Sequence, residues 1–280
     1  MKLKTLFILG DIGYLNYNLQ TAVTQISKQI MPNDIITLLG DNFYPSGVSS
    51  LNDPQWDIYN EIFKEIENPV YSILGNHDYL LNPKAQIFSP NWKMDGWYFK
   101  KEFDNVDLYF LDTNQFALEW VSEEILYQNH NLFSNDLIKN QLNWLETELK
   151  KNINKRKILF GHYPILTNGY YVDRMNKLYN SLINLFQKYD VNLYISGHEH
   201  NIQHINKKID KLDFTQVIIG SSSEVRDDVK NCQIVDMLNN KETFFGKLTI
   251  NSDNYHMQYF NLEGILKYEY YLNFFKDTMG

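Results

Sequence analysis

The chain has 280 residues, 44% of them hydrophobic and 21% charged, which is typical of a globular protein and excludes wholesale disorder. The net charge of −8 disfavours a nucleic-acid-binding surface, although a buried cation can still attract an anionic substrate. No apolar run is long enough to span a membrane or to form a signal peptide. The single cysteine, Cys232, excludes an intrachain disulfide. We therefore expect a monomer in the cytoplasm or elsewhere inside the cell, and a secreted protein only if the chain has been trimmed.

The first 78 residues alternate between apolar runs and helical patterns. The runs predict three short strands, at Leu3–Leu9, Ile35–Leu39 and Val70–Leu74. Helical spacing predicts two helices between them, at Leu15–Ile30 and Pro54–Glu67. The second helix has Ile58, Ile62 and Ile66 at four-residue spacing. This alternation of strand and helix predicts a parallel sheet.

The rest of the chain is more varied. Turn residues at Asp104-Asn105 predict a hairpin of Trp97–Lys101 and Val106–Asp112. Residues 113–135 have no clean period and are predicted to form an active-site lid loop. Two further helices are predicted at Asp136–Lys151 and Arg174–Tyr189, and five strands at Lys157–Phe160, Val191–Ile195, Phe214–Ile219, Phe244–Ile250 and Tyr255–Phe260. We expect the last three strands to be antiparallel and, because no linker is visible, residues 1–280 to form a single domain.

Five predicted strands end at a glycine beside a residue that can ligate a metal. These junctions are Gly10-Asp11, Gly40-Asp41, Gly75-Asn76, Gly161-His162 and Gly197-His198. Functional sites of open α/β sheets lie beyond the carboxyl ends of the strands, where glycine allows a sharp turn close to a bound group. One such junction would be an ordinary turn or helix cap. Five in one chain indicate a shared site.

The candidate ligands suit two cations. The set comprises Asp11, Asp41, Tyr44, Asn76, His162, His198 and His200. One aspartate could bridge two ions, and a phenol with a pKa near 10 ionises at neutral pH only beside a strongly acidic cation. Tyr44 therefore indicates Fe(III) at one position. The mixed nitrogen and oxygen donors suit a divalent iron, zinc or manganese ion at the other.

These motifs resemble those of the calcineurin-like metallophosphoesterases and, more narrowly, of the purple acid phosphatases of the short, tartrate-resistant type. They follow the family order over residues 10–200. Gly13 stands where ordinary metallophosphoesterases have a histidine, and Tyr44 follows the second aspartate, as in the purple acid phosphatases. The resemblance implies a four-layer α/β/β/α fold, a β-sandwich of two mixed sheets flanked by helices.

The resemblance also assigns roles to individual residues. It implies that Asp11, Tyr44 and His200 bind Fe(III), that Asn76, His162 and His198 bind the divalent ion, and that Asp41 bridges them. His77 would contact phosphate and assist the leaving group. Asp78 would either orient His77 or simply start the next turn.

One position departs from the family. The relatives have a second pocket histidine about nine residues after the histidine of the His-Tyr-Pro motif, and here Tyr170-Tyr171 stands in its place. Tyr171 is a candidate phosphate contact, but an ordinary tyrosine is a weak acid near neutral pH. The proton donor is left open between His77, His130 and water.

The function predicted is hydrolysis of phosphate monoesters, in small molecules or phosphoproteins, by a metal-activated hydroxide without a covalent intermediate. A phosphodiesterase or nucleotide hydrolase would use the same binuclear centre. A non-enzymatic adaptor is the remaining alternative, but a scaffold has no need to keep all seven ligands.

Overall fold

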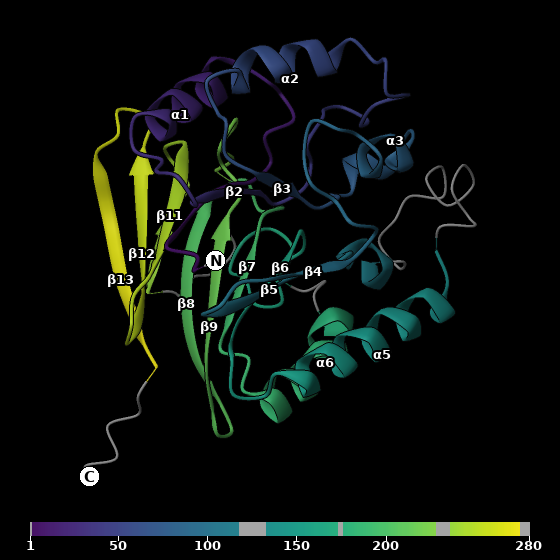
Figure 1. Ribbon diagram of the computed structural model, residues 1–280, viewed down its shortest axis with the longest axis vertical. Helices are drawn as coiled ribbons and strands as arrows, with labels where there is room; N and C mark the ends of the chain where they lie inside the picture. The colour runs from purple at the N-terminus through teal and green to yellow at the C-terminus, as the bar shows by residue number, and fades with distance from the viewer. Residues whose placement is uncertain (1, 118–132, 173–175, 228–235, 275–280) are drawn as a thin grey trace.

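A computed structural model of the protein describes residues 2–117, 133–172, 176–227 and 236–274. Two mixed β-sheets lie face to face, with helices on both outer faces (Figure 1). The predicted four-layer α/β/β/α arrangement is confirmed. Within the described ranges no helix is long and apolar enough to cross a membrane.

The first sheet has six strands in the order β13-β12-β11-β1-β2-β3. Their bounds are β1 Thr5–Leu9, β2 Ile35–Leu38, β3 Val70–Ser72, β11 Phe244–Ile250, β12 Asn254–Asn261 and β13 Leu266–Asn273. Strands β1, β2 and β3 are parallel, as predicted. Strand β11 pairs antiparallel with β1, and the sheet is extended by antiparallel pairing of β12 with β11 and of β13 with β12.

The second sheet has seven strands in the order β10-β8-β9-β7-β6-β5-β4. Their bounds are β4 Phe99–Glu102, β5 Val106–Phe110, β6 Arg156–Gly161, β7 Leu193–Ser196, β8 Ile202–Ile209, β9 Leu212–Ile219 and β10 Met237–Asn239. Strands β4 and β5 form the predicted hairpin. Strand β9 is antiparallel to β8 but parallel to β7, so the prediction of purely antiparallel pairing was wrong for this strand.

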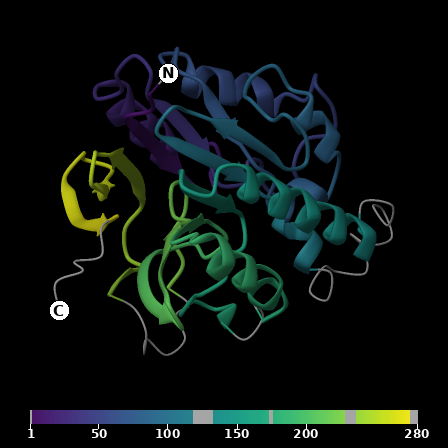
Figure 2. The same ribbon diagram turned by 60° about the horizontal axis from the view of Figure 1, so that its bottom comes forward.

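Helices cover the outer face of each sheet (Figures 1 and 2). The first sheet is covered by α1 Tyr17–Ser27 and α2 Gln55–Phe63, with the short α3 Pro83–Ile87 nearby, and the second by α5 Asn135–Lys151 and α6 Asn176–Tyr189. Two 3₁₀ helices are η1 His77–Tyr79 and η2 Thr113–Ala117. Successive side chains of a strand point to opposite faces of its sheet, which explains the layers. In β5 and β6, Phe110 and Phe160 belong to the core between the sheets, whereas Tyr109 and Leu159 pack with α5 and α6.

Sequence patterns missed some elements of the fold. Strands β8, β10 and β13 and helix α3 were not predicted. In α2 the buried residues are Trp56, Tyr59 and Phe63, whereas Ile58 is 50% exposed and Ile62 is only partly buried against the core. Aromatic rings bury more apolar area than isoleucine, and they decide how this helix rotates. Most of the predicted lid, residues 118–132, lies outside the described residues, as does His130.

Candidate metal centre

The five glycine junctions meet where strands of the two sheets end. Within the first sheet, the backbone N–H of Asp11 donates to the carbonyl of Gly40 at 3.2 Å. Within the second, the N–H of Gly197 donates to the carbonyl of His162 at 3.1 Å. Glycine is required at residue 75, since a Cβ there would overlap both the backbone and the carboxylate of Asp41. The sequence thus brings candidate ligands from distant segments to one place.

Three of the candidate ligands have left-handed backbone conformations. The φ angles are 54° at Asp11, 50° at Asp41 and 70° at His198. For residues other than glycine this conformation costs about 1–2 kcal/mol each. Strain of this kind persists where the surrounding structure enforces it, and it concentrates at functional sites.

One group of side chains surrounds Oδ2 of Asp41. The hydroxyl of Tyr44 donates to this oxygen at 3.1 Å and lies 3.0 Å from Nε2 of His200. Oδ1 of Asp11 is 3.4 Å from the same hydroxyl and 3.6 Å from the same imidazole nitrogen. All four side chains are buried, so their polar atoms face one another rather than water.

A second group lies beside Oδ1 of Asp41. Nε2 of His162 is 3.5 Å from this oxygen and 3.0 Å from Oδ1 of Asn76. Nδ1 of His198 is 3.0 Å from the same amide oxygen and 3.2 Å from Nε2 of His162. Asp41 therefore directs one carboxylate oxygen at each group, which is the arrangement of a bridging ligand.

The outer hydrogen bonds of two imidazoles leave lone pairs directed inward. Nδ1 of His162 lies 2.9 Å from the carbonyl oxygen of Leu39, an acceptor to which only a protonated nitrogen can donate. Nδ1 of His200 is similarly placed 3.1 Å from the carboxylate of Glu224. When each histidine is neutral, Nε2 is then an unprotonated acceptor facing other acceptors. Such a cluster of lone pairs fits cations.

Burial shifts the pKa values of the site in the directions that favour metal binding. Burial lowers the pKa of His162 and His198 and brings that of His200 to about 4, which keeps the imidazoles neutral. Burial and the charge of Asp41 raise the pKa of Asp11 and of Tyr44. A bound cation would offset the repulsion between the negative charge of Asp41 and the ionised forms of Asp11 and Tyr44. Asp11, Asp41 and His200 offer donor atoms within 4.8 Å of one another.

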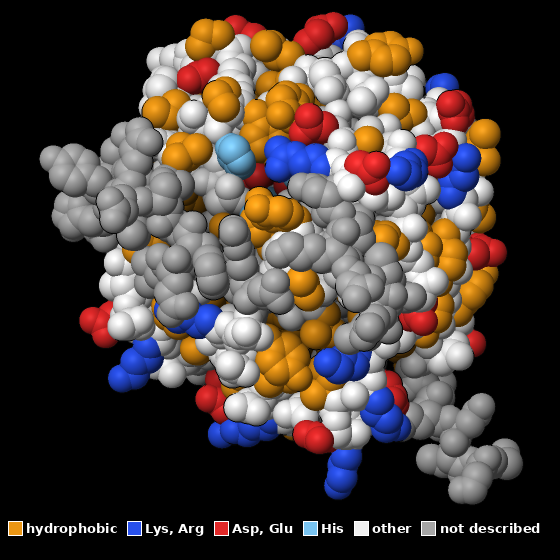
Figure 3. Space-filling view, turned by 180° about the vertical axis from the view of Figure 1, so that it is seen from behind, with side chains coloured by type: hydrophobic (Ala, Val, Ile, Leu, Met, Phe, Trp, Pro, Cys, Tyr) orange, Lys and Arg blue, Asp and Glu red, His pale blue; other side chains and the backbone are white. Residues whose placement is uncertain are grey.

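The three predicted catalytic residues occupy different positions around this site. Nε2 of His77 is 4.0 Å from Oδ2 of Asp41, and its Nδ1 is 2.6 Å from the carbonyl of Pro45. The ring of Tyr171 lies 4.3 Å from that of His198, measured between centroids. Figure 3 shows a face of the molecule on which a histidine lies beside a basic side chain.

The carboxylate of Asp78 organises the loops that carry the ligands. It accepts hydrogen bonds from the backbone N–H groups of Asn42 and Gly75, at 3.0 and 2.8 Å, and from the side chain of Gln86 at 2.9 Å. Burial raises its pKa to about 7. Its contacts thus connect the turns after β2 and β3, whereas the ring of His77 contacts Pro45.

Sequence reasoning missed three charged residues at the site. Glu199 accepts hydrogen bonds from the hydroxyl of Thr167 and from the backbone N–H groups of Tyr170 and Tyr171. It therefore ties the segment carrying Tyr171 to the two neighbouring histidines. Glu224 and Arg226 reach the site from the segment after β9, where no motif marked them. Of these three residues, only Glu199 could have been found from the sequence, because it lies between the candidate ligands His198 and His200.

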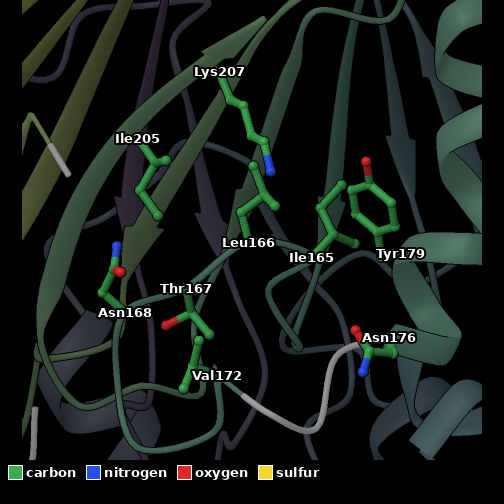
Figure 4. Close-up of a pocket in the computed structure, with 9 residues that line it drawn as sticks. All are labelled: Ile165, Leu166, Thr167, Asn168, Val172, Asn176, Tyr179, Ile205 and Lys207. Carbon is green, nitrogen blue, oxygen red and sulfur yellow. The ribbon is translucent and has the colours of Figure 1, made fainter. Parts of the chain in front are cut away.

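A separate cavity of about 300 Å³ lies between β8, α6 and the segment after β6 (Figure 4). Its walls include Ile165, Leu166, Tyr179 and Ile205, and the amine of Lys207 points toward Leu166. None of the seven candidate ligands lines it. The candidate metal centre is therefore not in this cavity.

Comparison with known proteins identifies the family. The sequence model of the calcineurin-like phosphoesterase family matches residues 4–201. The chain belongs to this family, as the resemblance of its motifs predicted.

Curated relatives narrow the similarity to acid phosphatases. The chain is 31% identical to purple acid phosphatase 7 of Arabidopsis thaliana over 212 residues, covering 71% of this chain and 64% of the relative. It is 32% identical to tartrate-resistant acid phosphatase type 5 of Oryctolagus cuniculus over 198 residues, covering 65% of this chain and 60% of the relative. The chain thus spans less than two thirds of the length of either relative.

Solved structures share the fold. GAP50, described as the anchor in the inner membrane complex of Plasmodium, superposes with a TM-score of 0.79 at 21% identity, covering 98% of this chain and 90% of that one. The protein TT1561 of Thermus thermophilus gives a TM-score of 0.53 at 10% identity, covering 97% of this chain and 99% of that one. At these identities the likeness shows the fold alone.

Proposed function

We propose that the protein is a binuclear metal-dependent phosphatase that hydrolyses phosphate monoesters, of the purple acid phosphatase type. The observation that carries the proposal is the division of the candidate ligands into two groups, one at each carboxylate oxygen of Asp41. Asp11, Tyr44 and His200 would hold Fe(III). Asn76, His162 and His198 would hold a divalent iron, zinc or manganese ion.

Two cations held in this way would supply a hydroxide nucleophile at neutral pH and offset the charge of the phosphate oxygens. Asp41 would hold the two ions at a fixed separation. His77 would contact phosphate and assist the leaving group, because its Nδ1 contact with Pro45 directs Nε2 toward Asp41. Tyr171, over the ring of His198, would offer its hydroxyl to a phosphate oxygen.

The substrates would be phosphate-ester small molecules or phosphoproteins. The net charge of −8 argues against nucleic acid as a partner, and the single cysteine fits a reducing, intracellular compartment. We expect the protein to act as a monomer.

Turnover and metal content together test this function. The metal-loaded protein should hydrolyse 4-nitrophenyl phosphate faster than bis(4-nitrophenyl) phosphate, whereas the reverse preference would indicate a phosphodiesterase. Asp41→Asn should lose both metals and at least 100-fold in kcat/KM, because the bridging charge disappears. Asp213→Asn is a suitable control, since this aspartate is exposed and pairs with Lys208.

Full metal content and full turnover in Asp41→Asn would contradict the assignment. Two bound metals in the wild type with turnover of neither ester would instead support the non-enzymatic adaptor.

A further inference from the structure

Arg226 is anchored beside the candidate metal centre by its backbone and its side chain. Its N–H donates to the carbonyl of His200 at 2.8 Å, and its Nε lies 3.5 Å from Oε2 of Glu224. The same carboxylate oxygen is 3.1 Å from Nδ1 of His200. A guanidinium has five N–H donors in a planar fork, which is more than this one contact uses. The side chain is 41% exposed, so a solute can reach it.

The charge of Arg226 acts on both groups of candidate ligands. Burial raises the pKa of Asp11 and Tyr44, and the guanidinium opposes that rise. Burial lowers the pKa of His198 and His200, and the same positive charge lowers it further. His198 belongs to one group of candidate ligands and the other three residues belong to the other, so the positive charge of Arg226 is felt in both groups.

Three tyrosines lie within electrostatic range of this cation. Tyr14, Tyr44 and Tyr171 all interact electrostatically with Arg226. The ring of Tyr14 lies 4.7 Å from that of Tyr44, and it is 47% exposed. Tyr171 lies over His198. Arg226 is thus a solvent-accessible cation bonded directly to the segment of one buried candidate ligand, His200.

We propose that Arg226 binds the phosphate group of the substrate and of the inorganic phosphate product. The inference rests on the proposed function. A guanidinium matches two phosphate oxygens with two parallel charge-assisted hydrogen bonds and remains charged at every working pH. Arg226 thereby supplies a permanent cationic contact that neither Tyr170 nor Tyr171 can supply.

A purely structural role makes a different prediction. If Arg226 only neutralises Glu224 and so steadies His200, its removal should weaken metal binding, as Glu224→Gln would. If Arg226 contacts phosphate, its removal should weaken phosphate binding while the metals stay. Arg226→Ala separates the two roles, because alanine keeps the backbone hydrogen bond to His200.

The test measures binding of inorganic phosphate to the metal-loaded protein by calorimetry at one pH, with metal content determined on the same samples. Arg226→Ala should raise the Kd for phosphate about tenfold or more with unchanged metal content, and Arg226→Lys should give a smaller rise. KM for 4-nitrophenyl phosphate should rise with the Kd. Lys208→Ala is the control for charge, because Lys208 lies six residues along β8 from Ile202, or roughly 20 Å away.

An unchanged Kd in Arg226→Ala would overturn the inference. Parallel loss of metal in Arg226→Ala and Glu224→Gln would also overturn it, in favour of the structural role. Failure of the metal-loaded wild type to bind phosphate at all would instead count against the proposed function.

Discussion

Glu199 provides a direct test of how the segment carrying Tyr171 is held. Glu199 is 2% exposed, and its carboxylate accepts three hydrogen bonds, from Thr167 at 2.9 Å and from the N–H groups of Tyr170 and Tyr171 at 3.0 and 3.1 Å. Glu199→Ala leaves three donors without this acceptor. At about 1 kcal/mol for each lost hydrogen bond, the free energy of unfolding should fall by roughly 3 kcal/mol.

Thermal unfolding measures this loss. A loss of roughly 3 kcal/mol corresponds to a fall in Tm of about 6–12 °C for a chain of this size. Glu61→Ala removes an exposed glutamate paired with Lys64 and should leave Tm nearly unchanged. Gly169→Ala should also lower Tm, because a Cβ there would overlap the carboxylate of Glu199. A Tm of Glu199→Ala within about 1 °C of the wild type would refute this account of the segment.

Three further predictions concern other parts of the chain. Gly75→Ala should reduce metal content at least several-fold, because its Cβ would displace Asp41, and metal analysis showing full occupancy would contradict this. Burial lowers the pKa of His204 to about 4, so between pH 6.5 and 4 the unfolded chain binds a proton that the folded protein does not. The free energy of unfolding should therefore fall by up to roughly 3 kcal/mol as the pH drops through this window, and His204→Gln should flatten the denaturation-versus-pH curve there. Ser134→Ala should cost about 1 kcal/mol in urea unfolding, because the Ser134 hydroxyl accepts from the N–H of Leu137 and caps α5, and Ser134→Asp should restore most of it.

The candidate ligands could be found in the sequence because each follows a local rule. A buried strand that ends at glycine and is followed by aspartate, asparagine or histidine is visible without any coordinates. The carboxyl ends of parallel strands then bring such residues together, as they do for Asp41 and Asn76.

The supporting residues could not be found in this way. Glu224 and Arg226 lie after β9, in a segment without a periodic pattern, and they reach His200 only because β9 runs beside β7. Strand β8 was missed because most of its residues are polar, with buried polar groups such as Gln203 and His204 standing where an apolar pattern was sought. Strand β13 is an edge strand that is largely exposed, so burial left little pattern in its sequence.

The visible absorption spectrum of protein purified from its native source, measured together with its metal content, tests the central claim most directly. The account predicts two metal ions per chain, at least one of them iron, and a purple charge-transfer band from a tyrosinate bound to Fe(III) that disappears in Tyr44→Phe. A colourless protein without iron, or a band that survives in Tyr44→Phe, would contradict it.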